Sequence, residues 1–143
     1  MSDIAWLTAR PIAQRGLHGR ARGVIENSFA AFEAAAQNGF AMECDVQLTV
    51  DGEAVVFHDF GLERLTGAQG AVMARKAVDL ASMALGGSAA GDTIRPLSDL
   101  LDLIAGRAPI VVEIKSRFDG DLRLARRVAE TLHGRPEPIA VKS

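Results

Sequence analysis

The chain has 143 residues, which is enough for one domain with a hydrophobic core but too few for two domains of ordinary size. The formal net charge is −2, with acidic and basic residues interspersed, so the sequence carries no basic patch for binding nucleic acid. Its apolar runs are too short to span a membrane. Cys44 is the one cysteine, and we expect a reducing, cytoplasmic location because no internal disulfide can form.

The hydrophobic pattern first predicts a short strand and then a helix. Residues 11–14 form a short run that ends at the pair Arg-Gly. The segment ENSFAAFEAAAQNGF (26–40) has apolar residues at helical spacing, with Asn27 or Ser28 as the N-cap and Gly39 as a left-handed stop. A helical crossover is therefore expected directly after the first strand.

Two strands joined by a tight turn are predicted next. In the segment AMECDVQLTV (41–50), apolar residues alternate with acidic or amide residues, which is the period of a strand. Asp51 and Gly52 form a strong turn signal, and the apolar run 54–57 follows them.

The middle of the chain has a weaker pattern. Residues 60–95 contain six glycines, so we expect loops there with one short helix near 78–83. A regular helix is expected from an N-cap at Ser98 to about Ala105, and Gly106 ends it.

The last third of the chain predicts a strand, a helix and the start of another strand. The apolar run 110–115 is typical of a buried strand, a helix follows over 121–133, and a strand begins near 138. One face of this helix is expected to carry Leu122, Ala125, Val128, Ala129 and Leu132.

Strands that alternate with helices predict a parallel sheet with helical crossovers. The pattern contains about five strands and three longer helices, without a repeat or a linker, so we expect one domain over 1–143. It fits an open α/β sheet or part of a (β/α)8 barrel. A full barrel needs roughly 250 residues, so this chain would supply little more than half of one.

Two pairs of charged residues at positions i and i+2 lie on predicted strands. Glu43 and Asp45 project from the same face, about 7 Å apart, and such carboxylates suit Mg²⁺ or Ca²⁺. Glu113 and Lys115 repeat the spacing, which adds a third carboxylate and a cation for an anionic ligand. The alternatives are a solvated strand face for the first pair and a salt-bridged sheet edge for the second.

Two further positions follow predicted strands, where parallel α/β folds place their sites. His58 is a candidate proton-transfer group, with capping of a loop as the alternative. Arg15 has the geometry to bind a phosphate through two hydrogen bonds, and Gly16 would let the backbone approach that ligand.

Three other polar or reactive residues have simpler interpretations. Glu26 and Asn27 directly precede the first long helix and are expected only to cap it. Cys44 points away from the two acids of its strand and is expected to be a small core residue.

In chain order, the strings RG, ENS, FAAFEAAAQNG, ECDVQLTVDGEAVVFHD, LERLTG, PLSDLL and VVEIKS resemble the motifs of the glycerophosphodiester phosphodiesterase family. The resemblance runs from Ile12 to Ser143, and its most specific part is the block from Glu43 to Asp59. It implies the N-terminal portion of a TIM (β/α)8 barrel, about five strands long and truncated. It also implies metal-dependent hydrolysis of glycerophosphodiesters to an alcohol and sn-glycerol 3-phosphate, and a role in glycerol and lipid metabolism.

The same resemblance implies a role for each matching residue. Glu43, Asp45 and Glu113 would hold a divalent metal, Mg²⁺ or Ca²⁺. Arg15 and Lys115 would neutralise the phosphate, with Arg15 also counted among the catalytic residues. His58 would be one of a pair of acid–base histidines. The expected partner is a small-molecule glycerophosphodiester, without nucleic acid or a membrane span.

Position 14 departs from the family pattern. Gln14 stands where the family has a histidine, immediately before Arg-Gly. An amide forms hydrogen bonds but does not titrate, and the loss of one acid–base group typically reduces a rate by about 10²- to 10⁴-fold. His18 would replace the histidine only if the loop after Arg15 folded back. The change of proline to Ile25 before Glu26 is expected to be harmless.

Three functions therefore remain open from the sequence. The first is hydrolysis of glycerophosphodiesters. The second is binding of metal or phosphodiesters by a catalytically impaired member or fragment. The third is a different metal-dependent phosphodiesterase of the phospholipase type. A half-barrel would also expose an unpaired parallel edge, which favours self-association or a partner.

Overall fold

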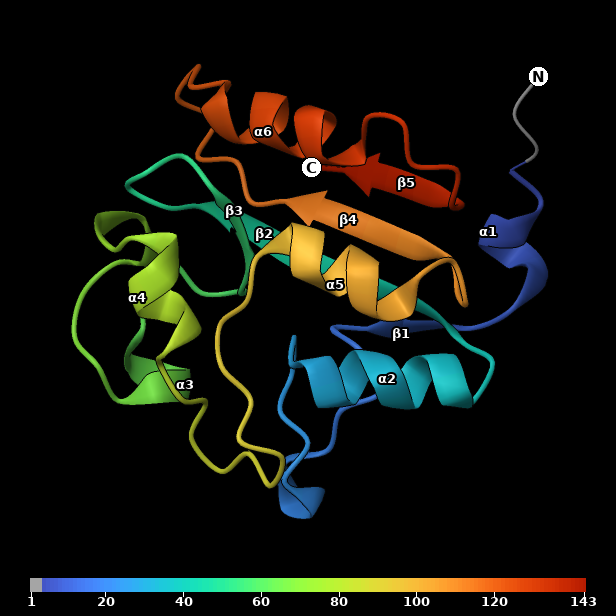
Figure 1. Cartoon of the computed structure of the whole chain (residues 1–143), viewed down its shortest axis with the longest axis horizontal. Helices are drawn as coiled ribbons and strands as arrows, with labels where there is room; N and C mark the ends of the chain where they lie inside the picture. Colours follow the sequence, from blue (N-terminus) through green and yellow to red (C-terminus); the bar gives the residue numbers. More distant parts are fainter. Residues whose placement is uncertain (1–3) are drawn as a thin grey trace.

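One mixed sheet carries the fold in the computed structural model, which describes residues 4–143. Its strands are β1 (Ile12–Gln14), β2 (Ala41–Leu48), β3 (Ala54–Val56), β4 (Ile110–Ile114) and β5 (Ile139–Lys142). The strands β1-β2-β4-β5 are adjacent in that order and parallel, as Figure 1 shows, while β3 pairs antiparallel with the end of β2.

The antiparallel β3 corrects one expectation. The count of about five strands is right, but only four of the strands in the described part of the chain are parallel. The turn at Asp51 and Gly52 is the cause: Gly52 has a φ of 80°, and the chain folds back as a hairpin onto β2. β3 therefore extends the end of β2 and is not a strand of the parallel series.

Three helices cover one face of the sheet (Figure 1): α2 (Phe29–Gln37), α5 (Leu97–Ile104) and α6 (Arg123–Leu132). Their apolar residues form one buried cluster with Met42, Cys44 and Val46 of β2 and with the matching residues of β4. Cys44 is fully buried in this cluster. Because side chains alternate along a strand, the acidic residues of β2 must project from the opposite face.

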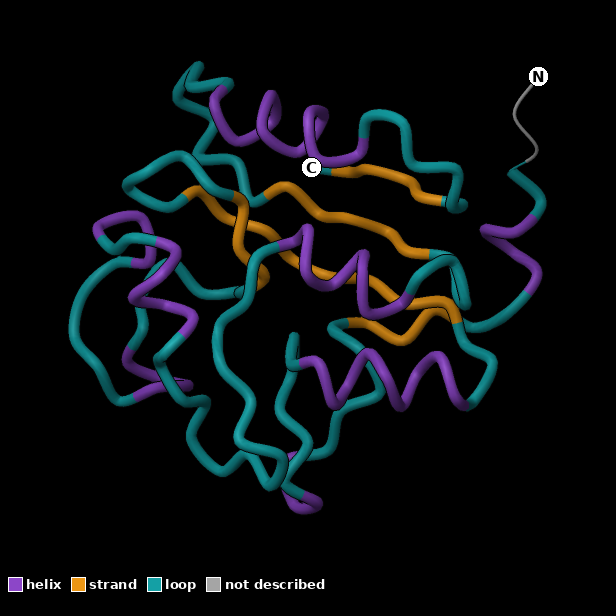
Figure 2. Tube along the Cα trace, viewed as in Figure 1, coloured by secondary structure: helices purple, strands orange, loops and turns teal. Residues whose placement is uncertain are grey.

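A long excursion between β3 and α5 lies beyond the carboxyl ends of the strands and consists mostly of loops (Figure 2). It contains α3 (Glu63–Thr66), the 3₁₀ turn η2 (Val72–Ala74) and α4 (Ala77–Ala81). The short helix expected near 78–83 is α4, but α3 and η2 were not expected. One of the glycines that suggested loops, Gly67, instead ends α3 with a φ of 76°.

The remaining short elements are α1 (Trp6–Ala9) before β1 and the 3₁₀ turn η1 (Arg20–Arg22) in the loop after β1. No helix between residues 4 and 143 has the length and apolar character needed to cross a membrane.

Two helix starts were predicted from capping residues, with different outcomes. Ser28 caps α2, because its Oγ accepts a hydrogen bond of 3.1 Å from the backbone N–H of Ala31. Ser98 does not cap α5, which begins one residue earlier at Leu97 and has Pro96 at the N-cap position. The fixed φ of Pro96, −63°, sets the entry to this helix without a side-chain cap.

The buried face of α6 also differs from the expected one. Leu124 and Val128, one turn apart, are buried, whereas Leu122 is 56% exposed and Ala129 is exposed. The helix begins at Arg123, so Leu122 lies outside it and faces solvent.

Candidate active site

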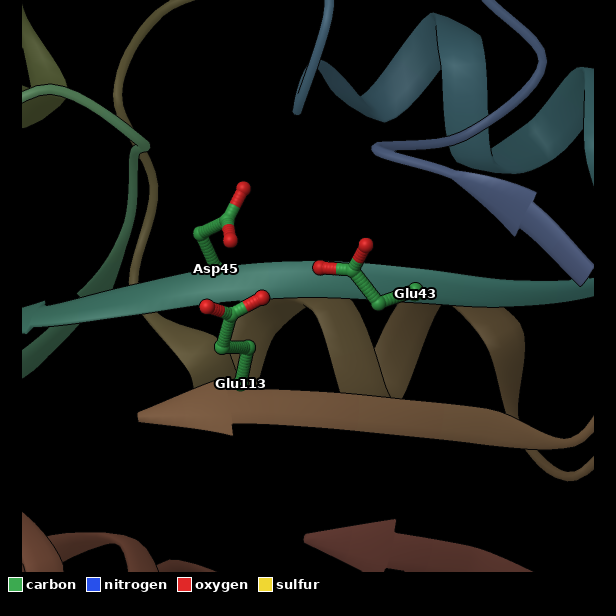
Figure 3. Close-up of side chains that lie close together, drawn as sticks. All are labelled: Glu43, Asp45 and Glu113. Atoms are coloured by element: carbon green, nitrogen blue, oxygen red, sulfur yellow. The ribbon is translucent and has the colours of Figure 1, made fainter. Parts of the chain in front are cut away.

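Three carboxylates converge on the sheet face that the helices leave open (Figure 3). Glu43 and Asp45 come from β2, and Glu113 comes from β4, where the parallel register pairs it with Asp45. One ligand atom of each residue lies within 4.8 Å of the others. Glu43 and Asp45 are only 4% and 1% exposed, so the solvated strand face considered above is wrong for this pair.

Asp45 is surrounded by hydrogen-bond donors. The Asn27 side-chain amide donates to Asp45 Oδ2 at 3.0 Å, and Asn27 Oδ1 accepts from the backbone N–H of Asp45 at 3.3 Å. Arg15 Nε lies 3.5 Å from Asp45 Oδ2, and Lys115 Nζ lies 3.4 Å from Asp45 Oδ1. These contacts compensate for the burial of the carboxylate.

Glu43 lacks such compensation. Its Oε1 is buried and has no hydrogen-bond partner among residues 4–143. Burial, followed by the negative charge of Asp45, raises the pKa of Glu43 to about 7, while the positive charge of Lys142 acts in the opposite direction. A buried acceptor of this kind is satisfied when a cation binds.

Glu113 lies between two lysines. Lys115 Nζ is 3.0 Å from Glu113 Oε1, and Lys142 Nζ on β5 is 3.3 Å from Glu113 Oε2. Burial raises the pKa of Glu113, but the two ammonium groups outweigh it and hold the pKa below its usual value. For Lys115, burial lowers the pKa, and the contacts with Glu113 and Asp45 outweigh this effect and raise it. Both groups therefore stay charged near neutral pH.

Arg15 lies directly after β1 in a left-handed conformation with a φ of 59°. Its Nη1 donates to Glu26 Oε2 at 2.6 Å, and its buried Nε has no hydrogen-bond acceptor in the described chain. Gly16 also has a structural role. A Cβ at Gly16 would lie 2.7 Å from the backbone carbon of Ala31, so the glycine allows close packing against α2.

His58 follows β3 and is held by its neighbour. Its Nδ1 lies 2.8 Å from Asp59 Oδ1. The Gln47 side-chain amide donates to the carbonyls of Phe57 at 2.8 Å and Asp59 at 2.5 Å, which fixes the backbone on both sides of His58. No hydrogen bond or ion pair within the described range joins His58 to the three carboxylates.

Gln14 is the last residue of β1, and its Cα pairs with that of Glu43. Its side chain is exposed and has no hydrogen bond to any of the described residues. His18, the possible substitute, is also exposed and unpaired within the same range. Gln14 therefore ends its strand next to the acidic cluster without a fixed contact.

Several site residues were missed by reasoning from the sequence. Glu26 and Asn27 were expected only to cap α2, but Ser28 does so and both of them enter the site. Arg64 and Lys142 were given no role, although each forms ion pairs with site carboxylates. The strings ENS and LERLTG were the available signals for three of these residues.

The fold and the site together define a class of protein: an α/β protein whose parallel strands carry an acidic cluster flanked by cations. The profile of the Glycerophosphoryl diester phosphodiesterase family matches residues 15–117. The chain belongs to this family. The resemblance to this family that the sequence motifs indicated is thereby confirmed.

A curated relative, a glycerophosphodiester phosphodiesterase from Caldanaerobacter subterraneus subsp. tengcongensis, is 37% identical over 111 residues. The match covers 73% of this chain and 44% of the relative. The solved structure of an Oleispira antarctica phosphodiesterase in complex with the product sn-glycerol-3-phosphate has a TM-score of 0.81 and 25% identity. That match covers 92% of this chain and 56% of the other.

A glycerophosphodiester phosphodiesterase structure from Agrobacterium tumefaciens has a TM-score of 0.72 and 27% identity, covering 94% of this chain and 58% of that one. The chain therefore spans about half the length of the relatives it matches. The expected fold class is confirmed, because the described residues have the fold of the N-terminal portion of these TIM barrels.

Proposed function

We propose that this chain forms the metal- and phosphate-binding part of a site that hydrolyses glycerophosphodiesters to an alcohol and sn-glycerol 3-phosphate. One observation carries the proposal. At this site two buried polar atoms lack hydrogen-bond partners in the described chain: Glu43 Oε1, an acceptor, and Arg15 Nε, a donor. A divalent cation satisfies the first and a phosphate oxygen the second, so a metal-bound phosphodiester would satisfy both.

The donor set fits a hard divalent cation. Three carboxylates with one oxygen each inside 4.8 Å match the ligand preference of Mg²⁺ or Ca²⁺. Glu43, Asp45 and Glu113 would hold the ion. When bound, such an ion polarises a phosphoryl oxygen and neutralises its developing charge.

Arg15 and Lys115 would bind the phosphate. Each now contacts carboxylates: Arg15 contacts Glu26 and Asp45, and Lys115 contacts Glu113 and Asp45. A cation bound to the carboxylates would reduce the negative charge around both side chains and leave their N–H groups for the anion. Their role is to orient the diester and to stabilise charge on its oxygens.

The candidate functions differ in whether the site must transfer protons. His58, with Nδ1 on Asp59, is the proton carrier that we assign to the site. Gln14 supplies only hydrogen bonds, so a second proton carrier is lacking at this position. We infer that turnover by this chain is slow. The second candidate function, phosphodiester or metal binding without turnover, is favoured by this same residue.

A binding experiment tests the metal and phosphate assignments without requiring turnover. Calorimetry with Mg²⁺ and Ca²⁺ is expected to show binding to the wild type and strongly weakened binding to Glu43→Ala. Glu130→Ala, which removes a carboxylate with a 68% exposed side chain on α6, is the control and should bind like the wild type. Unchanged cation affinity in Glu43→Ala would refute the ligand assignment.

A kinetic experiment then tests the reaction class. Hydrolysis of glycerophosphocholine is measured with either metal for the wild type and Gln14→His, with a long-chain phospholipid diester as the competing substrate. We expect Gln14→His to be faster by up to about 10²- to 10⁴-fold. Cation binding without hydrolysis in both proteins would favour the binding function, and preference for the long-chain diester would favour the phospholipase type.

We also propose that residues 1–143 act as one incomplete domain with a tendency to self-associate. Sheet order places β1 and β5 at the two edges of the described sheet, and Ile12 and Val141 on them are 40% and 49% exposed. Unpaired edges template pairing with another chain. Light scattering across a concentration series is expected to show oligomers.

The proposed hydrolysis of glycerophosphodiesters also implies a role in glycerol and lipid metabolism. We propose a cytoplasmic location for this chain as part of the same function.

A further inference from the structure

The string LERLTG has no role in the function proposed above. It forms the start of the excursion after β3, where α3 carries Arg64. The Arg64 guanidinium binds two carboxylates from separate segments. Its Nε and Nη2 donate to Asp59 at 2.7 and 2.9 Å, and its Nη1 donates to Glu26 at 2.5 Å.

Each of these carboxylates, Glu26 and Asp59, also contacts a second residue of the site. Glu26 accepts from Arg15 Nη1 at 2.6 Å through its other oxygen, and Asp59 lies 2.8 Å from His58 Nδ1. Five side chains therefore form a continuous series: arginine, glutamate, arginine, aspartate, histidine. The series links the loop after β1, which would bind phosphate, to the segment after β3, which would carry protons.

We propose that Arg64 is a positioning residue that fixes the ring of His58 through Asp59 and the guanidinium of Arg15 through Glu26. The proposal deepens the function proposed above and rests on it for its purpose. A planar guanidinium with several donors can bind one carboxylate through two hydrogen bonds and another through a third. Lysine, a compact ammonium, lacks this geometry.

The consequence for His58 is a defined tautomer. A carboxylate oxygen only accepts, so Asp59 favours the ring form that has its proton on Nδ1. Nε2, which has no hydrogen-bond partner in residues 4–143, is then the nitrogen that exchanges a proton with a ligand. Arg64 holds Asp59 in place for this contact.

The ionisation of Asp59 agrees with the geometry. The hydrogen bonds from Arg64, more than the contact with His58, lower the pKa of Asp59 to about 2. For Glu26, burial raises the pKa, and Arg64 and Arg15 outweigh it, so the pKa falls below its usual value. Both carboxylates remain charged acceptors throughout the neutral range.

The test is the tautomer of His58 in the metal-free and substrate-free chain. Long-range ¹H–¹⁵N spectra resolve the histidine rings, of which the sequence has three, and His58→Gln assigns the signal. The variants are Arg64→Met and Arg64→Lys. Arg107→Met is the matched control, because Arg107 also binds a carboxylate through two donors and is 44% exposed, against 45% for Arg64.

We expect the Nδ1–H form to predominate in the wild type and in Arg107→Met. In Arg64→Met its ratio to the Nε2–H form should fall about fivefold, the effect of losing the orientation that one hydrogen bond provides. Arg64→Lys should restore part of the ratio. The carboxyl ¹³C titration midpoint of Asp59 should rise from about 2 toward the ordinary 3.8 in Arg64→Met.

An unchanged ratio of the two His58 tautomers in Arg64→Met would overturn the proposal. Arg64 would then have only a structural role, connecting α3 to the segment before α2. If Arg64→Met does not fold, the same comparison is made with Arg64→Lys, for which an unchanged ratio and midpoint would again overturn it. The measurement needs neither metal nor substrate, so a lack of hydrolysis would count against the proposed function alone.

Discussion

Asn27 and Asp45 form a reciprocal pair of hydrogen bonds in which the amide donates to the carboxylate and its oxygen accepts from the Asp45 backbone. Both residues are buried, at 4% and 1% exposure. Asn27 has a φ of 57°, a left-handed conformation that asparagine tolerates better than most residues. This contact joins the start of α2 to the centre of β2 and orients one of the three clustered carboxylates.

Replacing Asn27 should therefore affect both stability and cation binding. Asn27→Ala removes a donor from a buried carboxylate, and we expect a loss of about 1 to 3 kcal/mol in the free energy of unfolding. Cation affinity should also fall, by about 10- to 100-fold, as for other residues that orient metal ligands. Urea denaturation and calorimetry measure the two effects. Asn38→Ala, at an exposed helix end, should leave cation affinity unchanged.

The acidic cluster should make the metal-free chain less stable as the pH rises. The pKa of Glu43 is raised to about 7 from an ordinary 4.5, so the native state holds its proton more tightly than the unfolded state. This stabilisation is fully present below pH 4.5 and is lost as the pH rises to about 7, amounting to about 3 kcal/mol.

The difference between the wild type and Glu43→Gln isolates this effect. Denaturation at pH 5 and pH 8 should show Glu43→Gln gaining about 2 to 3 kcal/mol on the wild type at the higher pH. Saturating Mg²⁺ or Ca²⁺ should stabilise the wild type at pH 8, since a ligand that binds only the native state raises its stability. Parallel pH profiles for the two proteins would contradict the assignment of the burial effect to Glu43.

Gly16 and Gly39 form a matched pair for testing close packing. Both have a positive φ, 80° and 74°, but a Cβ at Gly16 would lie 2.7 Å from Ala31, whereas a Cβ at Gly39 would meet nothing within 4 Å. Gly39→Ala should cost about 1 to 2 kcal/mol from backbone strain alone. Gly16→Ala should cost about 1 to 3 kcal/mol more, because the backbone of α2 must shift. Equal losses would show that α2 adjusts freely.

The Cys44 thiol should react with a labelling reagent only when the chain unfolds. Burial, and then the negative charges of Glu43 and Asp45, raises the pKa of the Cys44 thiol well above its usual value. The thiolate is the reactive form, so the native chain should resist a disulfide reagent while the denatured chain reacts at once. The labelling rate in mild urea should match the unfolding rate measured by circular dichroism. Fast labelling of the native chain would mean that the helix layer opens over β2.

Local pattern in the sequence determined much of this protein. The alternation of apolar and acidic residues in 41–48 placed Glu43 and Asp45 on one face and Cys44 in the core, because a strand repeats every two residues. The motif order was enough to identify the family, which the profile match confirmed. Periodicity also located the three covering helices, with errors confined to their ends and to the face of α6.

Only the tertiary structure decided which distant residues meet. The β2–β4 register set Glu113 beside Asp45, and the path of the loops brought Asn27 and Arg64 to the site. Strand and helix periods are local properties, so they can be read from neighbouring residues. Register and loop path depend on packing between distant segments, which local pattern does not encode. The hairpin that removes β3 from the parallel series is different, because the local turn at Asp51 and Gly52 forms it.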